Sequence, residues 1–133
     1  AFDHVVHVVA PVRALGNRAM SRDRHIITVL RRAASDTAPV VRTEAVLGLG
    51  MTGKSNAAPL LIKALSDAVL RVRIAAADGL SFVKSADSVE PLIEALRSKD
   101  ALLRRVAGEA LAFQTGVRFG EDYPLWREWY VNR

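Results

Sequence analysis

Apolar and polar positions repeat along the chain with a period of 31 residues. Three sets of identical residues lie at this spacing: Arg42, Arg73 and Arg104; Ala45, Ala76 and Ala107; and Leu49, Leu80 and Leu111. Leucines 30, 61 and 92 keep the same register upstream. We therefore expect one small supersecondary unit that is copied along the chain and buries its apolar stripe against neighbouring copies.

Each unit is predicted to contain two short helices. The first covers 59–65 and 90–96, where apolar residues follow the i, i+1, i+4 pattern and a proline lies in the first turn. Ser55 or Asn56 in one unit, and Asp87 in the next, are the expected N-caps. The second helix covers 41–49, 72–80 and 103–111, with the pattern V/L-R-x-x-A-x-x-x-L. Its small mid-stripe alanines, with Gly48 and Gly79, would let neighbouring helices approach closely.

An aspartate precedes the repeated arginine by six residues in two of the units. We expect Asp36 and Asp67 to cap the second helix and to pair with the arginine of the same or the next unit. The third unit differs, because Ser98 holds this position and Asp100 lies only four residues before its arginine. We therefore expect the contact between aspartate and arginine in the third unit to be weaker or to involve different residues.

The repeat resembles the HEAT repeat, and in particular the short HEAT-like class named after phycobilisome lyases. The matching features are prolines 59 and 91, the two Asp-x5-Arg pairs and the second-helix pattern. The resemblance implies an all-α fold, an α-α superhelix of about three to four helical hairpins with a concave binding face. We expect a single domain over 1–133, with a degenerate repeat at 1–34, regular repeats at 35–114 and a C-terminal cap at 115–133.

The cap is predicted from the aromatic residues, six of eight of which lie after residue 112. Asp122 and Pro124 would start a last helix that places Trp126, Trp129 and Tyr130 at i, i+3 and i+4. This segment resembles a tail that follows HEAT-like repeats in bacterial proteins. We interpret it as an apolar lid over the last repeat, with Trp126 and Trp129 as structural residues.

The net charge of +5 is concentrated near the N-terminus, because residues 1–35 contain six arginines against Asp3 and Asp23. A basic surface attracts acidic protein surfaces, nucleic acid or anionic lipid. We predict a partner-binding role for five arginines: Arg18, Arg22, Arg24, Arg31 and Arg32. Aromatic residues that could stack on bases are missing from the basic segment, which disfavours nucleic acid. The second-helix face offers further candidates of mixed charge: Thr43, Leu47, Asp78, Arg105 and Glu109.

Two motifs formally resemble known kinds of site, a phosphate-binding loop and a metal site. Residues 48–55 match the phosphate loop G-x4-G-K-S, but a helix precedes them instead of a strand, and 79–85 form the corresponding loop of the next unit. We interpret this motif as an inter-repeat turn. His4 and His7 could share a helix face, but no third metal ligand is evident in the adjacent segment, and His25 stands apart. No cofactor, metal or catalytic grouping is predicted, and the chain has no cysteine.

The leading hypothesis is a non-catalytic protein–protein interaction or scaffold module, a subunit of a larger assembly. Two alternatives stay open: an accessory subunit of the bilin lyase type, which the resemblance suggests, and a nucleic-acid-binding protein. No apolar run approaches the roughly 18 residues of a membrane span. The sequence begins at Ala1 without a methionine, which fits an exported, periplasmic origin as well as a trimmed chain.

Overall fold

The computed structural model describes residues 24–133, and this part of the chain contains helices and no strand. The α-helices are α2 (Arg24–Ala33), α3 (Pro39–Met51), α4 (Ala58–Ala64), α5 (Leu70–Gly79), α6 (Val89–Ala95), α7 (Ala101–Thr115) and α8 (Tyr123–Asn132). Two 3-10 turns, Ser55–Ala57 and Ala86–Ser88, lead into α4 and α6. The predicted all-α fold is confirmed.

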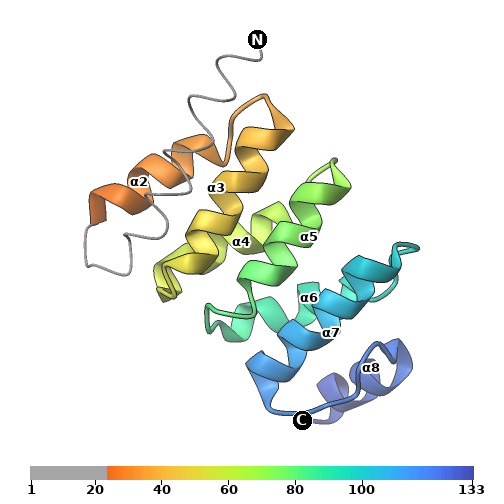
Figure 1. Cartoon of the computed structure of the whole chain (residues 1–133). Coiled ribbons are helices and arrows are strands. Elements are labelled where there is room, and N and C mark those ends of the chain that lie inside the picture. The colour runs from red at the N-terminus through yellow and green to blue at the C-terminus, as the bar shows by residue number, and fades with distance from the viewer. Residues whose placement is uncertain (1–23) are drawn as a thin grey trace.

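The helices form hairpins that stack side by side. In Figure 1, α3, α5 and α7 form one layer, and α4 and α6 lie behind it. We call α3, α5 and α7 the second-helix layer, because each is the second helix of its hairpin. Each of these helices contacts the next, as expected for an α-α superhelix whose units bury their apolar stripes against one another.

The core confirms the register read from the period. All three repeated alanines and all three repeated leucines are fully buried; they are Ala45, Ala76, Ala107, Leu49, Leu80 and Leu111. The helix α2 adds Ile26, Ile27 and Leu30 to the same cluster. Identical positions are buried in each unit because each unit meets its neighbours in the same way.

The prediction that Ser55 or Asn56, and Asp87, cap the first helices is wrong. The N-cap positions of the Ser55–Ala57 turn and of α4 are Lys54 and Ala57, and neither makes a side-chain cap hydrogen bond. Ser88, not Asp87, is the N-cap residue of α6, again without a side-chain bond. The 3-10 turn itself continues into the helix, so it satisfies backbone groups that a capping side chain would otherwise bond.

Two glycines let neighbouring second helices approach closely. A Cβ atom added to Gly50 of α3 would lie 2.6 Å from the Cα atom of Gly79 in α5. Gly79 is one of the two glycines expected to extend the small surface, and it does lie at this contact. Its partner is Gly50, which is not its equivalent position in the repeat.

The C-terminal segment covers the last hairpin. The Trp126 side chain of α8 is fully buried, and its Nε1 donates a hydrogen bond to the Gly120 carbonyl at 2.9 Å. Its ring makes edge contacts with Phe119 and Trp129, at centroid distances of 5.1 and 5.7 Å. A Cβ atom on Gly108 of α7 would lie 2.6 Å from the Gly120 oxygen. The loop before α8 therefore packs directly on α7.

Asp122 is the N-cap of α8, as expected, and its carboxylate accepts a hydrogen bond from Leu125 N at 3.1 Å. Among residues 24–133, no helix has the length and apolar character needed to cross a membrane.

Candidate interaction surface

An ion pair joins the first two repeats. Arg42 donates from Nε and Nη2 to the two carboxylate oxygens of Asp67, at 2.9 and 3.1 Å. Its Nη1 also donates to the Asp36 carbonyl at 3.0 Å. Both side chains of the pair are only 15% exposed. This bidentate geometry fixes the angle between two neighbouring second helices.

Burial alone would raise the pKa of Asp67, but hydrogen bonds and positive charge outweigh it. The Arg42 side chain and the Val69 N–H donate to this carboxylate, and the charges of Arg42 and Arg73 favour its ionised form. The pKa of Asp67 is therefore held below its ordinary value. The carboxylate is ionised at neutral pH, so the pair contributes to the stability of the array.

The aspartates hold the turn before the second helix instead of capping it. Asp36 accepts from Ala38 N at 2.8 Å and Asp67 from Val69 N at 2.9 Å. The N-cap residues of α3 and α5 are Ala38 and Val69, so the expected capping role is wrong by two positions. The bond spans two residues, which is the geometry of an Asx turn.

The repeated arginines share one backbone contact, six residues upstream, but differ in their carboxylate partners. Arg73 donates to the Asp67 carbonyl at 2.8 Å, and Arg104 donates to the Ser98 carbonyl at 3.0 Å. Arg104 also pairs with Glu121 of the C-terminal loop, at 3.2 Å. The prediction that the third unit differs is confirmed. Asp100 does not take the place of Asp36 and Asp67; it caps α7 by accepting a hydrogen bond from Leu103 N at 2.8 Å. The loop thus supplies the carboxylate that a further repeat would have supplied.

The structure describes only part of the predicted basic surface. Arg18 and Arg22 lie outside the described residues, and of Arg24 only the backbone, as the first residue of α2, is described. Arg31 and Arg32 are exposed in the last turn of α2. Positive charge at the C-terminal end of a helix stabilises the helix. The two arginines can therefore stabilise α2 as well as bind a partner.

The second-helix layer exposes most of the residues predicted on its face. Asp78, Arg105 and Glu109 are exposed and Leu47 is half-buried. Thr43 was expected there, but it is only 7% exposed, and its hydroxyl donates to the Pro39 carbonyl at 2.8 Å. The expectation that Thr43 is exposed on this face is therefore wrong.

Asp78 and Glu109 occupy equivalent repeat positions on α5 and α7. Partial burial, and next the negative charge of Glu109, raise the pKa of Asp78 above its ordinary value. The two carboxylates are therefore near enough to repel each other. We call Asp78 and Glu109 the acidic pair.

Sequence reasoning missed a line of exposed apolar residues at the ends of the three second helices. Met51, Phe82 and Phe113 lie 31 residues apart and are 43%, 59% and 38% exposed. Lys84 lies over the Phe113 ring at 4.5 Å and donates to the Phe113 carbonyl. We call these three residues the apolar row. The same period that identified the core would have found them, had it been applied to outward-facing positions.

A second missed residue is Gln114, which ties α7 to the turn after α5. Its Nε2 donates to the carbonyls of Leu80 and Val83, at 2.8 and 2.7 Å, and its Oε1 accepts from Ser85 N at 2.9 Å. The equivalent position in the preceding repeat is Val83. No repeated pattern could therefore have indicated this bridge.

The segment that resembles a phosphate loop is a turn between repeats. Leu49 is fully buried, and Thr52, itself buried, donates from Oγ1 to the Leu49 carbonyl at 2.7 Å. Gly53 has a positive φ of 64° and closes the turn. These bonds hold the helix end and leave no strand-to-helix cradle. In the described residues, no three His, Cys, Asp or Glu side chains are grouped to bind a metal ion.

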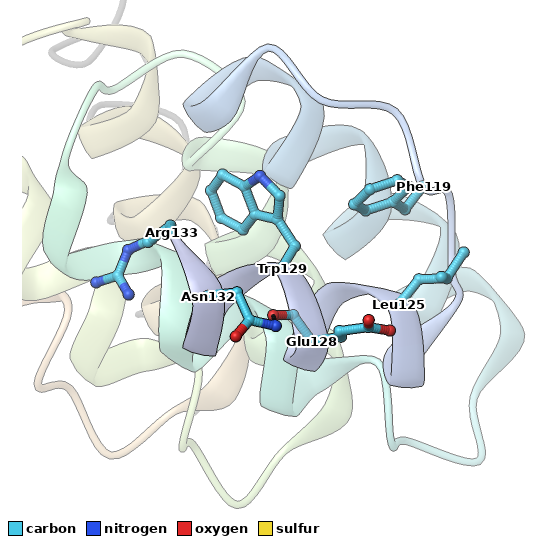
Figure 2. A pocket seen from close by; sticks show the side chains of 6 residues that line it. All are labelled: Phe119, Leu125, Glu128, Trp129, Asn132 and Arg133. Atoms are coloured by element: carbon cyan, nitrogen blue, oxygen red, sulfur yellow. Dashed lines mark hydrogen bonds between the residues drawn. The ribbon is translucent and has the colours of Figure 1, made fainter.

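A pocket of about 430 Å³ lies on the outer side of the cap (Figure 2). The six residues that line it are Phe119, Leu125, Glu128, Trp129, Asn132 and Arg133. Figure 2 shows Glu128 and Arg133 pointing away from one another, with Trp129 rising from α8 between them. Because the charged groups do not converge, this pocket lacks the arrangement expected of a catalytic site.

The sequence model of HEAT repeats matches residues 9–69 and 27–112. No curated protein matches the chain. The matched segments overlap and together cover well over half of the 133 residues, including α3, α5, most of α7 and the repeated arginines. The chain belongs to the HEAT repeat family.

Proposed function

We propose that this chain is a non-catalytic protein-interaction module that acts as a scaffold within a larger assembly. HEAT repeats are commonly scaffolds of this kind, and the helical array supports the proposal. The observation that carries it is the second-helix layer, in which outward-facing residues recur at equivalent positions on three adjacent helices. Such a layer offers a broad surface of defined spacing.

The charged side chains of the repeats are held by contacts within the fold. Arg42 and Asp67 are held in their bidentate pair, and Arg104 is held by Ser98 and Glu121. A surface whose geometry is fixed by such contacts loses little conformational freedom on binding, which favours recognition of a partner.

The basic surface is proposed as the first contact region. It comprises Arg18, Arg22, Arg24, Arg31 and Arg32. An acidic protein surface is the partner chemistry that this charge favours, through faster association and correct orientation. The second-helix layer is the second contact region.

Cross-linking in native cells, followed by purification and mass spectrometry, tests the proposal. The variant Arg31→Glu/Arg32→Glu should lose cross-linked protein, whereas Arg97→Glu/Lys99→Glu should retain it. This control reverses the same amount of charge on exposed residues at the other end of the array. Circular dichroism should show the same helix content in both variants.

Three results would contradict the proposal. One is a wild-type chain that cross-links to no protein under conditions where a known complex in the same cells does. Another is salt-sensitive retention of DNA or RNA that disappears in Arg31→Glu/Arg32→Glu, which would favour nucleic-acid binding. The last is a new visible absorption band on mixing with a linear tetrapyrrole, which would favour the bilin lyase type.

A further inference from the structure

The apolar row is a coherent surface feature. Isolated exposed apolar side chains are ordinary on proteins, but Met51, Phe82 and Phe113 recur at one position in three successive repeats. Repeated burial explains the leucines of the core, whereas these three side chains stay 43%, 59% and 38% exposed, although Lys84 lies over the Phe113 ring. Grouped exposed apolar residues with polar surroundings mark interaction sites.

The row is continuous from α3 to α7. Met51 directly follows Gly50, which touches Gly79 of α5, and Phe82 lies three residues after Gly79. The turn after α5 carries Lys84, whose ammonium group lies 4.5 Å from the centre of the Phe113 ring. The ends of the three helices therefore lie next to one another, and their apolar side chains line one edge of the second-helix layer.

Acidic side chains lie close to the row in sequence. Glu109 lies four residues before Phe113 within α7, one helical turn away on the same side, and Asp78 lies near the end of α5, four residues before Phe82 in the following turn. Neither carboxylate forms an ion pair with another residue of the described part of the chain. The one basic side chain described at the row is Lys84, which is held over the Phe113 ring and donates to the Phe113 carbonyl. A complementary partner thus has apolar residues in the middle and a basic side toward the acidic pair.

The spacing of the row fits a helix. Axes of packed helices lie about 8–10 Å apart, and a partner helix advances about 10.5 Å in seven residues, which returns it to the same face. Same-face residues of a strand repeat at only about 6.8 Å. An extended peptide would also need a sheet edge for its backbone hydrogen bonds, and residues 24–133 contain no strand.

We propose that the apolar row and the acidic pair bind an amphipathic α-helix of a partner protein. Its apolar residues at i, i+7 and i+14 lie on Met51, Phe82 and Phe113, and its lysine or arginine side chains lie against Asp78 and Glu109. Spanning three helices takes about 14 residues of partner helix, or roughly 20 Å. This inference rests on the proposed interaction function and specifies the chemistry of the partner.

The test measures the binding of fluorescein-labelled synthetic peptides of about 18 residues to the full, unlabelled chain. The first peptide is an amphipathic helix with leucines on one face and lysines beside them. The second has glutamate in place of lysine, and the third has the composition of the first in scrambled order. Fluorescence anisotropy at physiological salt should show binding of the first peptide about tenfold or more tighter than of the other two.

Variants of the chain locate the binding. Phe82→Ala, and separately Asp78→Asn/Glu109→Gln, should each weaken binding of the lysine peptide about tenfold or more. Leu125→Ala is the matched control, because Leu125 of α8 is 44% exposed, similar to Met51, but lies on the cap. It should leave the affinity unchanged. All variants alter exposed side chains, and their helix content is verified by circular dichroism.

The inference is overturned if the lysine peptide does not bind, if it binds no better than the glutamate or scrambled peptide, or if Phe82→Ala leaves its affinity unchanged. These failures are separable from failure of the proposed function. A chain that still cross-links to a protein in cells, sensitive to Arg31→Glu/Arg32→Glu but not to Phe82→Ala, would retain that function and lose this surface.

Discussion

Replacing Gly50 by alanine has two opposing effects on the stability of the fold. Gly50 lies in the last turn of α3, where helix propensity alone favours alanine by up to about 1 kcal/mol. The new Cβ atom would, however, lie 2.6 Å from the Gly79 Cα atom. Carbon atoms pack at about 3.5–4.0 Å, so α3 and α5 would have to separate by roughly 1 Å.

The net effect should be destabilising. Inserting a methyl group into a close-packed contact costs about 1–3 kcal/mol, and here the obstacle is backbone instead of a movable side chain. After subtracting a propensity gain of about 1 kcal/mol, Gly50→Ala should lower the free energy of unfolding by up to about 2 kcal/mol. For a chain of this length the melting temperature should fall by up to roughly 10 °C.

Urea unfolding followed by circular dichroism at 222 nm measures this change. We expect a lower midpoint with an unchanged slope. Ser81→Ala is the control, because Ser81 is the equivalent position one repeat later and is half-exposed. It should change the stability by less than about 0.5 kcal/mol. A Gly50→Ala variant that is more stable than the wild type by about 1 kcal/mol would refute the close contact.

Three further substitutions test the core, the cap and the ion pair. Leu80→Ala, at a fully buried position, should cost about 2–5 kcal/mol in urea unfolding, and a loss below about 0.5 kcal/mol would contradict the core register. Trp126→Ala should lower thermal stability more than Trp129→Ala, because only Trp126 is fully buried; the reverse order would contradict the lid. The lowered pKa of Asp67 adds stability above its ordinary titration range, near pH 4, which is lost as pH falls through the lower folded value. Asp67→Asn should therefore be less stable at pH 7 and show a flatter acid dependence of unfolding, whereas parallel pH curves would contradict the Arg42 pair.

The period predicted what is identical in every repeat. The buried alanines and leucines, such as Ala76 and Leu80, follow from stacking equivalent units, so the sequence alone gives the helix pairs and the core face. The start of the cap helix was also predictable, because Asp122 and Pro124 are strong local signals of a helix start.

Contacts between non-equivalent positions could not be predicted in this way. Gly50 of α3 meets Gly79 of α5, and the period relates only equivalent positions, so it does not pair these two glycines. The pairing of Arg104 with Glu121 depends on the path of the C-terminal loop, which has no counterpart in the repeat. The turns at Asp36 and Asp67 were misplaced because side-chain type indicates a turn without fixing which N–H it bonds.

The most direct test of the interaction surface is site-specific photo-cross-linking in native cells. The photoreactive residue p-benzoylphenylalanine would replace Phe82 in the apolar row and, as the control, Lys63, which is exposed on α4 in the other layer. We expect a discrete protein adduct from position 82 and none from position 63. Equal adducts from both positions, or none from position 82, would contradict the account.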